Sequence, residues 1–124
     1  MHKDIVDYVS ENNITKVKEL LESGISMAKY GNAPLRISTS KGYINIANLL
    51  IEYGTIVNVE NLTACVTEAI FKGHADIIKL LIDNGANFDF NTKIYGRTPL
   101  RYAIWHNNSS MAKVLVDNGA KFNA

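Results

Sequence analysis

Residues 73–85 read Gly73-His74-Ala75-Asp76-Ile77-Ile78-Lys79-Leu80-Leu81-Ile82-Asp83-Asn84-Gly85, an apolar run between two glycines. The same frame recurs along the chain, because a pair of apolar residues precedes a closing glycine in four places. These closing glycines are Gly24, Gly54, Gly85 and Gly119. Successive units are therefore 30, 31 and 34 residues apart, and a period of this length is typical of stacked repeats rather than of a single globular core.

Each unit is expected to contain two helices. Twelve residues before the closing glycine stands a glycine or an asparagine, which tolerate the left-handed backbone at a helix end; these are Asn12, Gly42, Gly73 and Asn107. The first helix should end there, and its small residues allow a neighbouring helix to approach closely; these are Ser38, Ala69 and Ala103. The second helix is expected to begin at a capping residue three positions later; these residues are Thr15, Asn45, Asp76 and Ser110.

Three motifs resemble those of a known family. Thr98-Pro99-Leu100-Arg101-Tyr102-Ala103 resembles the Thr-Pro-Leu-His-x-Ala signature of ankyrin repeats, and residues 73–81 and 85–87 resemble its later Gly-His and Gly-Ala-Asp parts. The resemblance covers essentially the whole chain. It implies an all-α ankyrin-repeat solenoid of stacked helix-turn-helix units with short hairpin or loop fingers. We expect residues 1–124 to form one domain, with repeats at roughly 1–29, 30–60, 61–94 and 95–124.

The third unit departs from this signature at the start of its first helix. The signature histidine is absent from every unit, so its usual bonds between repeats are not expected; its replacements are Arg36, Thr67 and Arg101. Residues 64–67 also lack the threonine and the proline, so we expect Asn61 or Thr63 to cap a helix whose boundary is shifted.

The two ends of the chain differ in polarity. Lys16 and Glu19 occupy apolar positions of the later units, which suits a terminal repeat with nothing to cover. The fourth unit has no obvious polar outer face; its apolar residues are Met111, Val114, Leu115 and Val116. A large exposed apolar area is a liability. This pattern favours a fragment of a longer array, with a partner over the last face as the alternative.

Only the connectors after the closing glycines vary in length. Residues 25–29 and 55–60 are short, so their fingers should be small, whereas residues 86–94 are long enough for a complete hairpin finger. Shortened repeats of this kind are similar to those of large DNA viruses and some intracellular bacteria.

Composition limits the class of partner and the compartment. Thirteen Lys and Arg residues oppose twelve Asp and Glu residues, so we expect neither nucleic acid nor a membrane as the partner. The single cysteine excludes an internal disulfide and suits a reducing compartment. We expect a cytoplasmic or otherwise intracellular location, the cell of a host included.

The residues offer little chemistry. Cys65 and His74 are the only conceivable nucleophile and base, and we favour an inert buried thiol and a structural imidazole. The three histidines lack metal-ligand spacing. The Asp-Asn-Gly segments at 83–85 and 117–119 suit helix ends better than calcium sites. We therefore expect no catalytic, metal or cofactor site and no enzymatic activity.

The resemblance instead implies a protein-binding surface at the finger tips and at the ends of the first helices. The candidate residues are Tyr30, Asn32, Lys41, Asn61, Phe71, Lys72, Tyr95, Arg97, Trp105 and His106. Tyr and Trp are strong candidates because, with Arg, they dominate binding energy at interfaces. Tyr30 and Tyr95 should be exposed in the fingers, whereas for Phe71 and Trp105 exposure and packing over the neighbouring repeat are equally expected.

We thus expect a non-catalytic module that binds a partner protein through its finger tips and concave face, centred on the third and fourth units and mildly basic. The alternative is a targeting or adaptor domain cut from a larger multidomain effector, enzyme or ubiquitin-ligase adaptor. Two rivals are an enzyme that uses Cys65 and a structural homo-oligomer. We expect a monomer, unless the fourth unit is covered by a second copy or by further repeats.

Overall fold

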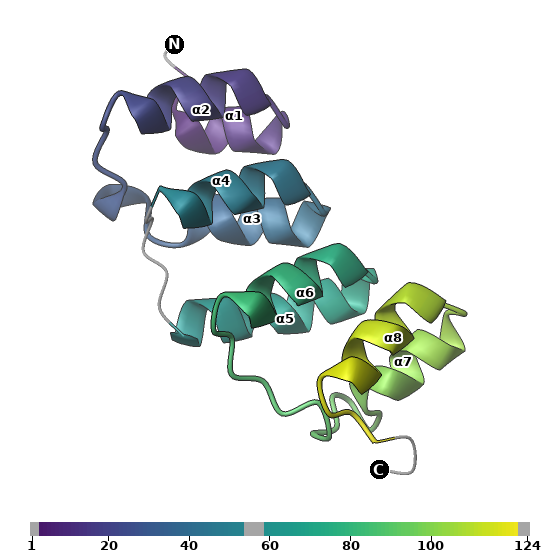
Figure 1. The fold of residues 1–124 in the computed structure, drawn as a ribbon. Coiled ribbons are helices and arrows are strands. Elements are labelled where there is room, and N and C mark those ends of the chain that lie inside the picture. Colours follow the sequence, from purple (N-terminus) through teal and green to yellow (C-terminus); the bar gives the residue numbers. More distant parts are fainter. Residues whose placement is uncertain (1–2, 54–58, 122–124) are drawn as a thin grey trace.

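The computed structural model describes residues 3–53 and 59–121, and these contain four helix pairs. The helices are α1 (Ile5–Ser10), α2 (Ile14–Glu22), α3 (Ala33–Lys41), α4 (Ile44–Glu52), α5 (Val59–Lys72), α6 (Ala75–Asp83), α7 (Pro99–Trp105) and α8 (Ser109–Asp117). Figure 1 shows the pairs stacked in chain order, with the first helices in one layer, the second helices in another, and the first and third connectors along one edge. The predicted all-α solenoid is confirmed.

The turn inside each pair has the predicted left-handed backbone. Its φ is 57° at Asn12, 77° at Gly42, 74° at Gly73 and 54° at Asn107. Glycine has no Cβ to clash in this region, and asparagine tolerates it better than most residues do. The spacing therefore located the end of each first helix correctly.

The predicted caps of the second helices were wrong by two residues. These helices begin at Ile14, Ile44, Ala75 and Ser109, so the residues expected as caps lie in their first turns. Only one residue separates the left-handed position from each helix, so that residue is the N-cap. Asn13 accepts from the Lys16 N–H at 3.1 Å, and Asn108 accepts from the Met111 N–H at 3.0 Å.

The helix α5 begins earlier than the signature positions would place it. Its boundary is shifted as expected, to Val59, but Asn61 and Thr63 lie inside the helix and do not act as its caps. The Thr63 hydroxyl instead accepts from the Asn87 N–H at 3.2 Å, and so ties α5 to the following connector.

Hydrogen bonds link neighbouring pairs at the turns. The His74 Nε2 is 3.0 Å from the Ser40 carbonyl oxygen, and the Asn108 amide donates to the Gly73 carbonyl at 3.0 Å. The structural role expected for His74 is therefore confirmed. The small residues of the first helices are wholly buried, as predicted; they are Ser38, Ala69 and Ala103.

The end faces of the stack differ, but not entirely as expected. Lys16 and Glu19 are exposed and paired at 3.4 Å, as predicted for a polar first face. In the fourth pair, however, Met111 and Leu115 point inward and are buried. The exposed apolar side chains of this pair include Val116 and Ile104, which is 52% exposed although its counterparts in the earlier pairs are buried; those counterparts are Val9, Thr39 and Ile70.

The third finger is a complete hairpin turn, as its length predicts. Ile94 and Arg97 form an antiparallel bridge, with N–H to carbonyl distances of 2.7 and 3.1 Å. Tyr95 and Gly96 between them have φ of 50° and 84°, which matches the two positive φ values of a type I′ turn. The first connector contains only the 3-10 turn Ala28–Tyr30, whereas the second falls largely on residues 54–58, outside the described residues.

Candidate functional site

The third finger carries Tyr95 at its tip. Both central positions of the turn need a left-handed backbone, and Tyr95 occupies one of them at φ 50°. Its side chain is 89% exposed, so the predicted exposure is confirmed. The turn thus holds a large aromatic ring in solvent, on backbone fixed by the bridge at its base.

Phe71 connects this finger to the third helix pair. It lies in the last turn of α5, with its ring centroid 5.7 Å from that of Tyr95 and 5.4 Å from that of Tyr102, which it meets edge to face. These are favourable aromatic separations. Phe71 is nevertheless 40% exposed. Both expectations hold for Phe71, because it packs on the neighbouring repeat and still presents a free face.

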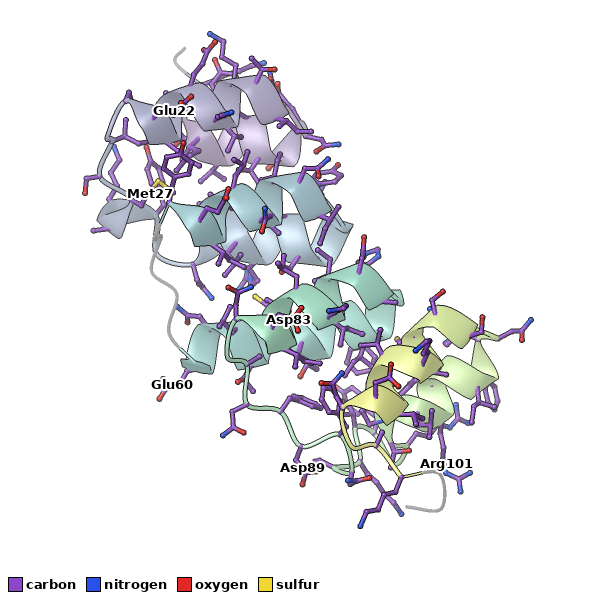
Figure 2. All side chains as sticks on the ribbon, in the orientation of Figure 1. Glu22, Met27, Glu60, Asp83, Asp89 and Arg101 are labelled. Atoms are coloured by element: carbon purple, nitrogen blue, oxygen red, sulfur yellow. The ribbon has the colours of Figure 1, made fainter. Side chains whose placement is uncertain are left out.

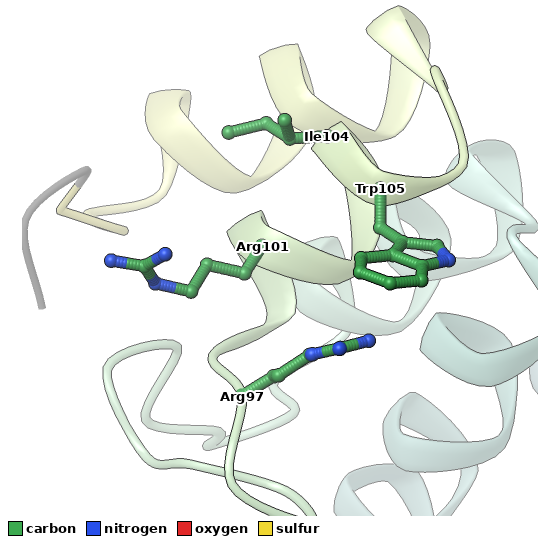
Figure 3. Close-up of a pocket in the computed structure, with 4 residues that line it drawn as sticks. All are labelled: Arg97, Arg101, Ile104 and Trp105. Atoms are coloured by element: carbon green, nitrogen blue, oxygen red, sulfur yellow. The ribbon is translucent and has the colours of Figure 1, made fainter.

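Trp105 ends α7 and stacks on Arg97 at the base of the finger. The guanidinium carbon lies 3.9 Å from the centroid of the ring, within the range of a cation–π contact. Figure 3 shows the guanidinium beside the indole, with Arg101 and Ile104 on the same helix as Trp105. Trp105 is 66% exposed. Of the two outcomes expected equally for Trp105, exposure is therefore confirmed, and Arg97 stacks on the ring.

An open hollow of about 320 Å³ lies against this tryptophan. It is lined by Arg97, Arg101, Ile104 and Trp105. Arg101 projects from α7 away from the helix stack (Figure 2). The sequence patterns did not identify Arg101 or Ile104 as site residues. They marked Arg101 only as the replacement of a signature histidine. The spacing could have identified Arg101, because a residue four positions before a helical tryptophan shares its face.

Tyr102 is a third residue that the sequence patterns did not single out. Its hydroxyl donates to the Ile94 carbonyl at 2.8 Å, and its ring supports Phe71. It therefore fixes the finger to α7 and is half-buried. Its role is to position the exposed aromatics rather than to present a face of its own.

Six of the ten candidate residues lie on the third and fourth repeats around this finger. Lys72 and His106 are exposed and line a smaller hollow of about 180 Å³ that Phe71 also borders. We call the six residues the α5–α7 surface: Phe71, Lys72, Tyr95, Arg97, Trp105 and His106. They are joined through the Phe71–Tyr95 contact, the Arg97–Trp105 stack and the shared hollow.

The other four candidates belong to the second repeat and the start of the third. Lys41 is exposed at the end of α3, whereas Asn32 and Asn61 are half-buried. The exposure predicted for Tyr30 was wrong, because it is half-buried and packs against the core. The short first connector folds into a 3-10 turn, which brings this ring against the helices, with the Lys29 Nζ 5.1 Å from its centroid.

The structure places the possible reactive groups in structural settings. Cys65 is wholly buried, and burial raises the pKa of its thiol, which disfavours the reactive thiolate. Asp83 and Asp117 pair with lysines one turn earlier, at 2.8 and 2.9 Å. Among residues 3–53 and 59–121 there is no group of three His, Cys, Asp or Glu that could hold a metal ion.

Within the same ranges, no helix has both the length and the apolar character needed to cross a bilayer.

Comparisons with known proteins agree with this architecture. A family model described as "Ankyrin repeats (3 copies)" matches residues 59–124, just over half of the chain. Relatives include the E3 ubiquitin-protein ligase XBAT33 of Arabidopsis thaliana, which is 28% identical over 80% of this chain and 21% of its own. The ankyrin repeat protein L66 of Acanthamoeba polyphaga mimivirus is 30% identical over 67% of this chain and 14% of its own.

A third relative is the ankyrin repeat protein FPV031 of fowlpox virus, 28% identical over 62% of this chain and 24% of its own. The chain thus spans about a quarter or less of these relatives. Viral proteins are among them, in line with the similarity noted for the shortened repeats. With the helix pairs, the left-handed turns and the hairpin finger, the match is conclusive: the chain belongs to the ankyrin repeat family, whose repeats are a non-catalytic fold for binding other proteins.

Proposed function

We propose that this chain is a non-catalytic recruitment module that binds a partner protein through the α5–α7 surface. One observation carries the proposal: Trp105 and Tyr95 are 66% and 89% exposed although they are among the largest apolar side chains of the chain. Both rings are held in place, one by the stack on Arg97 and the other by the finger turn and Phe71. Exposed apolar groups gathered on one face are typical of interaction sites.

The chemistry of the surface supports protein binding. Trp, Tyr and Arg are the residue types most enriched among binding hot spots. Rigid rings also lose little conformational entropy when a partner covers them. Lys72 and Arg97 add positive charge, so the surface should prefer a partner with some negative charge. Truncation of a hot-spot residue typically costs about 2–4 kcal/mol of binding free energy.

The test uses a partner captured from the native cell and identified by mass spectrometry. Its affinity is then measured for the natural chain, for a Trp105→Ala, Tyr95→Ala double variant and for Tyr53→Ala. Tyr53 is a matched control because it is 43% exposed but lies after α4, in the second repeat. We expect the double variant to lose at least about thirty-fold in affinity, the equivalent of 2 kcal/mol, and the control to bind normally. A folded double variant with full affinity would refute the proposal.

A second candidate function is that of a recruiting segment within a larger protein. The supporting observation is the short span of the chain on its relatives, which include an E3 ubiquitin-protein ligase. The chain would then deliver a bound protein to an activity elsewhere in the polypeptide. An open reading frame that continues past the codon for Ala124 would support this function, and a stop codon directly after it would count against it.

The remaining proposals concern the state of the chain. We propose that residues 1–124 act as one domain, that the chain is monomeric, and that it works inside a cell, the cell of a host included. The composition, with one cysteine, supports the last point. Sedimentation at high concentration tests the second, because a monomer is expected and a concentration-dependent dimer would contradict it.

A further inference from the structure

The hollow beside Trp105 contains two guanidinium groups that nothing neutralises within the described residues. The ion pairs of residues 3–53 and 59–121 are formed by lysines with carboxylates, and neither Arg97 nor Arg101 takes part in one. No acidic residue lines the hollow. The net charge of the whole chain is only +1, so this is a local excess of positive charge.

Arg97 is held in a way that keeps its donors available. Its flat face stacks on Trp105 at 3.9 Å, and stacking does not use the N–H groups at the edge of the guanidinium. No carboxylate of residues 3–53 or 59–121 pairs with these N–H groups. A guanidinium fixed in this way can donate two parallel hydrogen bonds to one carboxylate.

The rest of the hollow is apolar. The indole of Trp105 forms one wall, and Ile104, 52% exposed, forms another. The volume of the hollow, about 320 Å³, is at the lower end of the range of ligand pockets, roughly 300–1,000 Å³. The hollow thus offers two different features side by side: donors for an anion and a surface for an apolar side chain.

We propose that this hollow, formed by Arg97, Arg101, Ile104 and Trp105 and called here the Arg–Trp notch, binds an acidic segment of the partner protein. An Asp or Glu carboxylate of the segment pairs with Arg97, and an apolar side chain next to it in the segment packs on Trp105 and Ile104. Arg101, whose guanidinium extends to the other side of the hollow (Figure 3), adds a second positive charge for a further acidic residue of the segment. The inference rests on the proposed function and adds the chemistry of the bound segment.

The charge pattern favours an acidic peptide over a nucleic acid. Affinity for a nucleic acid rises with the number of phosphates that cations neutralise, and the notch presents only two cations. A single carboxylate needs no more than one guanidinium fork. The apolar wall also matches an aliphatic or aromatic side chain, which a peptide supplies beside its carboxylate.

In the experiment, 12-residue peptides from a display library are selected for binding to the intact chain. Their binding is then measured by the fluorescence of Trp105, the only tryptophan of the sequence. Selected sequences should be enriched in Asp or Glu next to an apolar residue. Their binding should protect Trp105 from quenching, and an Arg97→Gln, Arg101→Gln double variant should bind at least ten-fold more weakly. The control is Lys79→Gln, Lys113→Gln, which removes the same charge from exposed sites on α6 and α8 and should bind normally.

Several results separate this inference from the proposed function. Neutral or basic peptides that protect Trp105 would overturn the acidic segment but support a protein-binding surface. Selected peptides that leave Trp105 unprotected would contradict both. Equal losses in the two double variants would show a general charge effect and overturn the notch. If a 20-nucleotide single strand binds more tightly than the peptides, the notch is a nucleic-acid site and the inference is overturned. If protection of Trp105 rises with protein concentration alone, the notch binds a second copy of the chain, which also overturns the inference.

Discussion

Replacement of Gly42 by alanine tests how neighbouring repeats are joined. Gly42 has φ 77°, and a Cβ built there would lie 2.8 Å from the Cε1 and 3.0 Å from the Nδ1 of His74. The imidazole is the end of a side chain and can move aside. It is also the group whose Nε2 lies 3.0 Å from the Ser40 carbonyl oxygen. The methyl group therefore displaces the ring and breaks a bond between the second and third repeats.

The cost has two parts. Placing a residue with a Cβ in the left-handed region lowers the free energy of unfolding by about 1–2 kcal/mol. The unfolded chain has less conformational entropy with alanine than with glycine, and this offsets about 0.4–1 kcal/mol of the loss. The backbone part is thus about 1 kcal/mol. Loss of the His74–Ser40 hydrogen bond adds about 1 kcal/mol. The free energy of unfolding should fall by about 2 kcal/mol in Gly42→Ala.

Gly24→Ala is the matched control. Its φ is 79°, and a Cβ at this position would have nothing within 4 Å, so only the backbone part applies and the expected loss is about 1 kcal/mol. Both variants are compared by urea unfolding followed by far-UV circular dichroism. In a His74→Ala background the cost of Gly42→Ala should fall to that of Gly24→Ala. Equal losses in the natural background, or a Gly42→Ala cost unchanged by His74→Ala, would refute the reasoning.

Three further predictions concern the stack. Ile70→Ala should cost about 2–5 kcal/mol of unfolding free energy because Ile70 is buried, whereas the same change at its exposed counterpart Ile104 should cost less than about 1 kcal/mol; equal losses in urea unfolding would show that the Ile104 position is covered. Asn108→Asp should keep the cap of α8 but lose the bond to the Gly73 carbonyl, so its melting temperature should fall between those of the natural chain and Asn108→Ala, and a value equal to either limit would contradict the dual role. The raised pKa of Cys65 means that the unfolded chain releases the thiol proton first, so stability should decline as pH rises above about 8.5, and a Cys65→Ala variant with an unchanged pH profile would contradict this.

The period and the left-handed turns could be predicted because the period depends on glycine, and the turns on glycine or asparagine, at a fixed spacing. The closing glycines and the residues twelve positions before them therefore located the helix pairs. The starts of the second helices were misplaced because Thr, Asn, Asp and Ser suit the first turn as well as the cap. His74 shows the difficulty, because it occupies an N-cap without a side-chain cap bond.

The binding surface was only partly predictable. Exposure of Tyr95 follows from the turn that contains it, which is a local property. The burial of Tyr30 and the exposure of Ile104 depend on how a connector folds and on which face meets another repeat. Side-chain type alone does not determine either. Arg101 lines the hollow because it lies on the same helix as Trp105 and because the finger places Arg97 against the tryptophan ring. The second of these conditions depends on how the finger folds.

The most direct test of the account observes Trp105 in the complex with the captured partner. The chain is labelled with 5-fluorotryptophan, which enters only at this position because the chain has one tryptophan, and its ¹⁹F NMR resonance is recorded with and without unlabelled partner. We predict that binding shifts the resonance and removes its sensitivity to exchange of H₂O for D₂O, because the partner covers the indole. A saturated complex in which the resonance and its solvent sensitivity are unchanged would contradict recognition through the α5–α7 surface.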